Sequence, residues 1–367
     1  MRIAVIAPPW LSVPPAGYGG TERVLDELCR AFVGDGHEVL LCATGDSTCP
    51  VERAWCYAHG GGTDHASPAS ELRHVVHAYD AVRMWGADVV HDHTITGPFY
   101  AAHHPDLVVV TTNHGPFDAA LAPLYRVMSR RIPVIAISHH QASTAADIPI
   151  AAVIHHGVDV SRFPIGHGRG GYALFLGRMS PTKGVDTAIR VARRAGMPLL
   201  IAAKMVEPDE HAYFDARVRP LLGDGIEYVG EVGGQAKLAL LADAVCLVNP
   251  IAWPEPFGMV MIEALACATP VLTTPCGAAP EIVEDGATGF IRANETTLAG
   301  AFGELARLNR ARCRAAAEHR FSAKRMAGDH ARLFDRLVHP AHPAGAATPI
   351  GTRTSDIADP PGGALVH

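Results

Sequence analysis

The sequence predicts two doubly wound α/β domains that face each other across a cleft. Short apolar runs alternate with helical patterns along the chain, which is typical of repeated βαβ units. A Gly-rich break at residues 164–172 separates two series of these units. The chain has 367 residues, more than the roughly 250–300 residues at which single cores stop growing.

The first half of the chain carries one series of βαβ units. Its strands are predicted at Ile3–Ala7, Glu38–Ala43, Asp88–His91, Val108–Thr112, Val134–Ser138 and Ala152–His155. Between the first two strands, apolar residues recur at helical spacing, and Gly34 and Gly36 end the helix. The N-terminal apolar run is short and breaks at Pro8-Pro9, so it is interpreted as a buried strand and not as a signal peptide.

The second half repeats the alternation after the linker. Its strands are predicted at Ala173–Leu176, Leu199–Ala203, Ile226–Val229, Ala244–Asn249 and Val271–Thr274. Helices are predicted at Val185–Ala195 and Lys237–Ala242, from near Phe257, and over a last region from about Thr297 to Leu337.

These elements divide the chain into a first domain, a linker and a second domain. The predicted limits are 1–163, 164–172 and 173–320, followed by a C-terminal helix at 321–338 that could cross back to the first domain. Residues 339–367 are rich in Pro, Gly and Ala and are predicted to be a disordered tail.

Composition argues against two classes of partner, although membrane association is not excluded. The net charge is −6, and no basic stripe is present, which argues against nucleic acid and an anionic membrane surface. Eight scattered cysteines without a CxxC pair indicate buried reduced thiols. No apolar run approaches the ~18 residues of a transmembrane helix. A cytoplasmic protein is therefore expected.

Candidate binding residues follow the strand ends, where open α/β sheets place their ligands. Gly19 and Gly20 allow close backbone approach of a phosphate or sugar before the first helix, although a flexible surface loop would have the same composition. Arg178 and Lys183 bracket a strand-to-helix turn and suit a diphosphate. The alternative for these two is a pair of solvated surface charges.

The stretch "PEPFGMVMIEA" raises the sharpest question, because Glu263 lies in an apolar run. A helix starting near Phe257 would present the N–H groups of Gly258 and Met259 to a phosphate. Glu263 could then accept hydrogen bonds from ribose hydroxyls, and Glu255 could reach the sugar on the other side. The alternative is a buried structural ion pair at Glu263 and an exposed loop acid at Glu255.

Histidines also gather at the predicted strand ends. His91, His93 and His114 could bind a metal, but no compact ligand set with known spacing is present. We therefore expect hydrogen-bonding histidines that line a cleft, and no metal ligand is assigned.

Four motifs together resemble the retaining GT-B glycosyltransferases of family 4. They are "GGTE" (19–22), "GRMSPTKG" (177–184), "PEPFGMVMIEA" (254–264) and "APEIVEDGATGF" (279–290), within a match from about Met1 to Leu337. The resemblance implies two Rossmann-like domains. It also implies that Arg178 and Lys183 hold the donor diphosphate and that Glu263 binds the ribose.

The same resemblance implies roles for the remaining site residues. Glu255 and His114 would contact the donor sugar, the Gly19-Gly20 loop would approach it from the first domain, and the region of Val232 would line the base. Phe257, Gly258 and Met259 belong to the same donor site. His156, Ala203 and Ala278 depart from the family pattern, which puts the choice of donor sugar in question.

The resemblance implies transfer of a sugar from a UDP- or GDP-sugar with retention, by front-face attack. No cofactor is expected, and no metal is required in the site, because cations and a helix N-terminus can stabilise the diphosphate. The acidic balance favours a small soluble acceptor or metabolite over a lipid, although a local patch could override it. An epimerase and a non-catalytic sugar-binding protein stay open as alternatives, whereas no lysine has the sequence context of a pyridoxal phosphate-dependent phosphorylase.

Overall fold

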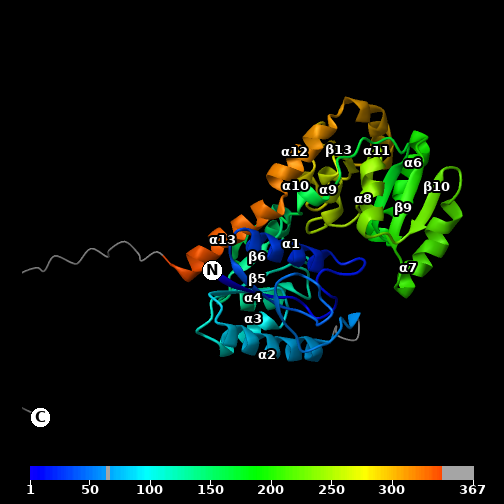
Figure 1. The fold of residues 1–367 in the computed structure, drawn as a ribbon. Coiled ribbons are helices and arrows are strands. Elements are labelled where there is room, and N and C mark those ends of the chain that lie inside the picture. Colours follow the sequence, from blue (N-terminus) through cyan, green and yellow to red (C-terminus); the bar gives the residue numbers. More distant parts are fainter. Residues whose placement is uncertain (63–66, 341–367) are drawn as a thin grey trace, which may run out of the picture.

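The computed structural model describes residues 1–62 and 67–340 and contains two α/β domains (Figure 1). Within the described residues, one parallel sheet has seven strands and the other has six. The two doubly wound domains predicted from the sequence are therefore confirmed. The exact domain limits stay a prediction, and the predicted tail lies outside the described residues from position 341 onward.

The first sheet has the strand order β3-β2-β1-β4-β5-β6-β7. Its strands are β1 (Arg2–Ile6), β2 (Glu38–Cys42), β3 (Glu52–Ala54), β4 (Val89–Asp92), β5 (Val109–Thr112), β6 (Val134–Ala136) and β7 (Ile150–Val153). Its helices are α1 (Gly20–Gly34), α2 (Pro68–Trp85), α3 (Gly97–Tyr100), α4 (Ala122–Met128) and α5 (His139–Ser143).

The second sheet has the strand order β10-β9-β8-β11-β12-β13. Its strands are β8 (Ala173–Arg178), β9 (Leu199–Lys204), β10 (Ile226–Gly230), β11 (Leu247–Asn249), β12 (Val271–Thr273) and β13 (Gly289–Ile291). The helices that follow β8 are α6 (Val185–Ala195), α7 (Pro208–Tyr213), α8 (Gly234–Asp243), α9 (Met259–Ala266), α10 (Ala279–Ile282), α11 (Glu295–Gly300), α12 (Arg310–Arg320) and α13 (Ala323–Val338).

Both sheets reverse their strand order at one point, between β1 and β4 in the first and between β8 and β11 in the second. Crevices outside the carboxyl ends of strands at such points are the usual ligand sites of open α/β sheets. The loops that follow these strands therefore position the functional site.

The first strand, β1, shows why the strands of these sheets have continuous apolar sequences. Ile3 and Val5 pack in a core with α1 and α13, whereas Ala4 and Ile6 pack against α2 around Tyr79. Successive side chains of a strand point to opposite faces, so a strand covered by helices on both faces is apolar at every position.

The linker is attached to the second domain. Backbone N–H groups of Gly166, Gly168 and Gly170 donate to the carbonyls of Cys267, Ala242 and Asp243. A Cβ atom on Gly166 would lie 2.1 Å from the Ala242 carbonyl oxygen, so this close approach requires glycine.

The last two helices run from the second domain back to the first. Figure 1 shows α12 beside the second sheet, and α13, in orange, reaching α1. Met326 and Phe334 of α13 are fully buried in the same core as Phe32 of α1. Of the helices in the described ranges, none has both the length and the apolar character needed to cross a bilayer.

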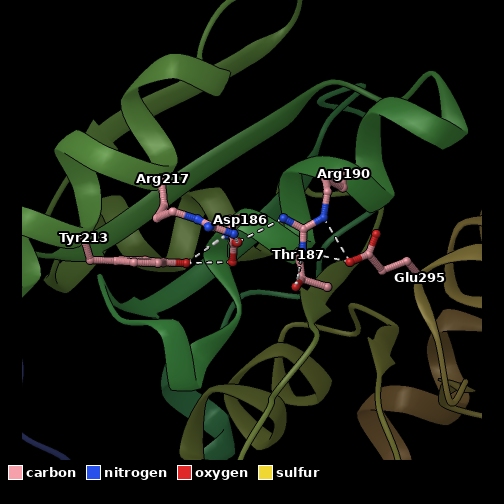
Figure 2. A network of polar contacts seen from close by, with 6 residues as sticks. All are labelled: Asp186, Thr187, Arg190, Tyr213, Arg217 and Glu295. Carbon is pink, nitrogen blue, oxygen red and sulfur yellow. Dashed lines mark hydrogen bonds and ion pairs between the residues drawn. The ribbon is translucent and has the colours of Figure 1, made fainter.

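A polar network fixes α6, the helix that follows the Arg178–Lys183 turn (Figure 2). The Asp186 carboxylate accepts hydrogen bonds from Arg190 at 2.9 Å, from the Tyr213 hydroxyl at 2.8 Å and from Arg217 at 3.3 Å. Arg190 also donates to Glu295 of α11 at 2.7 Å. Burial alone would raise the pKa of Asp186, but these donors together hold it below its usual range.

We expect Asp186→Asn to lower the free energy of unfolding by about 1–2 kcal/mol at pH 7, because charge-assisted hydrogen bonds are lost. The pKa of this carboxyl is depressed in the folded protein, so its contribution is present above the unfolded pKa of about 3.9 and is lost below it. Urea denaturation from pH 7 to pH 3 should show the two proteins converging only below about pH 4. Asp80→Asn, at an exposed position of α2, is the control, and an equal loss there would contradict the network's role.

Candidate active site

A pocket opens at the carboxyl ends of the two sheets and encloses about 1160 Å³ of empty space, part of it open to solvent. The first domain contributes the loop after β1 and His114 after β5. The second contributes Leu176 and Gly177 of β8, Lys204 of β9, Asn249 of β11 and the N-terminus of α9. The pocket therefore occupies the crevice that the strand orders predict.

The structure brings almost all of the sequence-predicted site residues to this pocket. Those that line it are Gly19, Gly20, His114, Lys183, Val232, Glu255, Phe257, Gly258, Met259 and Glu263. Arg178 is not among the lining residues, although it ends β8 directly after the lining residue Gly177. Burial raises the pKa of the pocket residue Tyr18, and the nearby charge of Arg178 opposes that rise.

The helix predicted from near Phe257 begins at Met259, two residues later. Gly258 precedes it with a φ of 108°, a left-handed conformation that side chains disfavour. The first N–H groups of a helix have no acceptor within the helix. Because Gly258, Met259 and Val260 all line the pocket, this end of α9 can bind an anion.

Lys183 and Glu255 form an ion pair inside the pocket. Nζ of Lys183 donates to Oε2 of Glu255 at 2.6 Å, and the two side chains are 13% and 14% exposed. The Lys183 ammonium also lies 5.7 Å from the centre of the Trp253 ring. The cation predicted for a phosphate and the carboxylate predicted for a sugar are thus direct neighbours.

Glu263 has a protein partner that the sequence interpretation did not name. Nζ of Lys237, from α8, donates to Oε1 of Glu263 at 2.6 Å, and both residues are buried. The ion pair that the sequence analysis kept as the alternative is therefore present, and ribose binding by Glu263 stays a prediction. Oε2 of Glu263 accepts no hydrogen bond from the residues that the structure describes. That oxygen stays available to a ligand hydroxyl.

Two imidazoles, those of His114 and His156, belong to the first-domain wall of the pocket, and buried His93 contacts His114. Nδ1 of His93 and Nε2 of His114 are 2.8 Å apart, and the His114 ring stacks on His156 with centres 5.2 Å apart. Burial, helped by the charge of His330, lowers the pKa of His114 to about 4. His114 is therefore neutral at pH 7 and can donate or accept one hydrogen bond without supplying a charge.

The glycine loop after β1 reaches across to the second domain. The backbone N–H of Tyr18 donates to Oε1 of Glu231 at 2.8 Å. A Cβ on Gly17 would lie 2.7 Å from the same oxygen. The ammonium of Lys204 lies 5.9 Å from the centre of the Tyr18 ring. This loop therefore covers the part of the pocket next to Val232.

Gly277 holds the loop that carries Glu255. Its φ is +62°, and a Cβ there would lie 2.4 Å from both the backbone nitrogen and the carbonyl oxygen of Glu255. The neighbouring Ala278 donates its N–H to that carbonyl at 2.9 Å. The position of Glu255 thus requires glycine, which has no side chain, at residue 277.

We expect Gly277→Ala to lower the free energy of unfolding by about 2 kcal/mol or more, since it combines left-handed strain with a backbone clash. Gly286→Ala is the matched control, because Gly286 has a φ of +73° and nothing within 4 Å of its virtual Cβ. Urea denaturation of both variants separates the clash from the strain. Equal losses in the two variants would show that the contact with Glu255 costs nothing.

Several charged pocket residues were not assigned to the site from the sequence, among them Arg23, Lys204, Glu231 and Lys237. Lys237 did carry a signal, since it is a lone cation in the apolar stretch "AKLALLA", just as Glu263 is a lone anion in its own helix. His156, expected at a cleft wall as a departure from the family pattern, also lines the pocket. All eight cysteines are free, and six of them are buried as predicted, whereas Cys56 and Cys276 are partly exposed.

Comparison with known protein families identifies both domains. Residues 18–162 match the model described as Glycosyltransferase Family 4, and residues 170–307 match the model described as Glycosyl transferases group 1. This chain belongs to the family 4 glycosyltransferases. The first match lies in the domain of the seven-stranded sheet, and the second match lies in the domain of the six-stranded sheet. Residues 163–169 of the glycosyltransferase lie between the two matches.

Full-length relatives agree with this assignment. The glycosyltransferase is 29% identical to a glycogen synthase of Mycobacterium tuberculosis over 349 residues, which covers 79% of this chain and 81% of the relative. Among solved structures, AviGT4, a glycosyltransferase involved in avilamycin A biosynthesis, is 27% identical with a TM-score of 0.71, covering 93% of this chain and 98% of that one. HepE of Anabaena, solved with UDP-glucose, shares the fold at 20% identity and a TM-score of 0.68, covering 90% and 98%.

Proposed function

We propose that this glycosyltransferase takes a sugar from a nucleoside diphosphate donor bound in the pocket and transfers it, with retention, to a small soluble acceptor. The observation that carries the proposal is the arrangement of Lys183, Lys237 and the N-terminus of α9 around one pocket that also holds Glu255 and Glu263. Cationic groups for a diphosphate and carboxylates for sugar hydroxyls therefore line the same pocket.

The leaving diphosphate gains negative charge as the glycosidic bond breaks. Preorganised cations and helix N–H groups stabilise such charge without reorganising. Lys183 and the end of α9 supply both, so we propose that the donor site works without a metal ion. A phosphate oxygen would then accept the proton of the acceptor hydroxyl during front-face attack, while neutral His114 contacts the sugar.

Uridine is the first base to test, since the related fold of HepE was solved with UDP-glucose. Val232 and the covering loop at Tyr18 would enclose the base. Glu263 would bind the ribose through Oε2 while Oε1 remains on Lys237. The departures at His156 and Ala278 lie at the pocket or next to the Glu255 loop, where they would select the donor sugar.

The test is a thermal-shift titration of the purified protein with UDP, GDP, ADP and NAD in EDTA. A ligand at about 100 times its dissociation constant should stabilise the protein by about 2.7 kcal/mol. We expect one nucleoside diphosphate to shift the melting temperature and NAD to have no effect. No shift with any diphosphate, or a shift with NAD alone, would contradict the proposed donor site.

Product analysis separates transfer from the two alternatives. With the matching nucleotide sugar and a mixture of hydroxyl acceptors, a transferase releases the nucleoside diphosphate. An epimerase returns a different nucleotide sugar, and a binding protein returns the donor intact. The anomeric configuration of the product, measured by NMR, then decides between retention and inversion.

A further inference from the structure

A cluster of metal-ligating side chains lies between the two domains and outside the donor pocket. His139 is the first residue of α5, His155 follows β7, and Glu281 belongs to α10 of the second domain. One potential ligand atom from each of the three lies within 4.8 Å of the other two. Neither the motifs nor the proposed sugar transfer gives this cluster a role.

The carboxylate of Glu281 is held in place by the first domain. Its oxygens accept the backbone N–H of His139 at 2.8 Å, the backbone N–H of His140 at 2.6 Å and Nε2 of His155 at 2.8 Å. Burial alone would raise the pKa of Glu281, but these donors hold it below its usual range. Glu281 is therefore ionised at neutral pH, as a metal ligand must be.

The two imidazoles stand beside this carboxylate. The rings of His139 and His155 are 5.7 Å apart and nearly perpendicular, at 85°. The backbone N–H groups of His139 and His140 donate to the carboxylate of Glu281. Outer hydrogen bonds of this kind orient a carboxylate that ligates a metal. His155 is only partly exposed and lies 5.8 Å from the Phe257 ring, so its imidazole has little freedom to turn away.

The spacing is close to that of a transition-metal site. Zinc–ligand bonds of about 2.0–2.2 Å place neighbouring ligands of a tetrahedral ion roughly 3.3 Å apart. Closing from 4.8 Å requires mainly a rotation of His139, which is exposed and makes no hydrogen bond through its ring to any described residue. The ion would replace the single hydrogen bond between His155 and Glu281.

The surrounding charges do not oppose a cation. Arg320 contacts the Glu281 backbone carbonyl, but its guanidinium is paired with Glu284. Arg325, which donates to the His155 carbonyl at 2.8 Å, is paired with Asp329 at 2.9 Å. The formal charge of the three-ligand set is therefore −1, from Glu281.

We propose that His139, His155 and Glu281 form a binding site for a divalent transition-metal ion, with Zn²⁺ as the best match. Zinc accepts two imidazoles and one carboxylate as ligands, whereas Mg²⁺ and Ca²⁺ favour the carboxylate but not the imidazoles. Because two ligands come from the first domain and one from the second, the ion joins the domains. The site is separate from the donor pocket, so it can fail or succeed independently of the proposed sugar transfer.

The test is a titration of the metal-stripped full chain with Co²⁺, whose visible d–d absorption reports a four- or five-coordinate nitrogen and oxygen site. We expect one equivalent of Co²⁺ to produce this band and one equivalent of Zn²⁺ to remove it. His139→Ala should weaken Co²⁺ binding roughly tenfold or more, because a ligand is lost. Its exposed side chain contributes little to folding, so this variant stays comparable with the wild type.

His211→Ala is the matched control, since His211 is exposed on α7, far from the cluster in sequence, and Co²⁺ binding should not change. Zn²⁺ should also raise the melting temperature of the wild type and of His211→Ala, but not of His139→Ala. Three results would overturn the site: only the weak spectrum of hydrated Co²⁺, equal binding by His139→Ala and the wild type, or a thiolate charge-transfer band that assigns the ion to a cysteine.

Discussion

Lys237→Met is expected to lower the free energy of unfolding by about 3–5 kcal/mol, because it leaves the Glu263 carboxylate buried without its partner. Lys237 is 8% exposed and Glu263 is 3% exposed, so solvent cannot replace the lost contact. Glu263→Met should cost a similar amount by stranding the ammonium. Urea denaturation of each single variant measures both losses.

The double variant Lys237→Met/Glu263→Met separates a structural role from a ligand-binding role. Replacing a buried ion pair by apolar side chains of similar volume is often neutral or stabilising, so we expect the double variant to recover most of the lost stability. It should still fail to bind the nucleoside diphosphate if Oε2 of Glu263 holds the ribose. Wild-type affinity in the double variant would mean that the pair serves the fold alone.

The sequence predicted the strands that carry an apolar run, including β7 and β10 at sheet edges. β1, β2, β4, β5, β8 and β9 were found within one or two residues, because burial on both faces leaves a continuous apolar signal. β3 (Glu52–Ala54) and β13 (Gly289–Ile291) were missed. Each has three residues and lies at a sheet edge, where the sequence "ERA" or "GFI" contains no strand pattern.

The site residues could be predicted where they directly follow a strand in the sequence. They could not be predicted where their contacts depend on how separate elements pack together. Lys183, Glu255 and the start of α9 come from local stretches, so their proximity could be inferred from the topology. The pairing of Lys237 with Glu263 depends on how α8 packs on α9. The contact of Glu281 with His155 joins residues 126 positions apart across two domains. No spacing rule within one segment reports such contacts.

The sequence could not decide whether Glu263 binds a ribose or forms a buried ion pair, because its partner lies on a different helix. A lone carboxylate in an apolar helix requires a partner, and the sequence offers either a ligand or a distant lysine. The structure shows that one oxygen meets the lysine while the carboxylate still lines the pocket. The two interpretations are therefore compatible, which makes the double variant more informative than Glu263→Ala alone.

Lys183→Met is expected to weaken binding of the nucleoside diphosphate by roughly 10- to 150-fold, the equivalent of about 1.5–3 kcal/mol for a lost charge-assisted contact. Binding of the matching nucleoside monophosphate should change much less, because Lys183 is proposed to hold the diphosphate and not the base or ribose. Calorimetric titration with both nucleotides measures this ratio.

Glu255→Gln is the matched variant, since it breaks the same 2.6 Å ion pair from the anionic side. Removing this carboxylate removes repulsion toward a diphosphate, so we expect nucleotide affinity to stay equal or to rise. The rate of sugar transfer should nevertheless fall by about 10²–10³-fold if Glu255 acts on the sugar in the transition state. Opposite signs of the two affinity changes would assign Lys183 to the diphosphate and Glu255 to the sugar. Equal losses of affinity in both variants would instead mean that the ion pair only shapes the loop, and the proposed division of roles would be wrong.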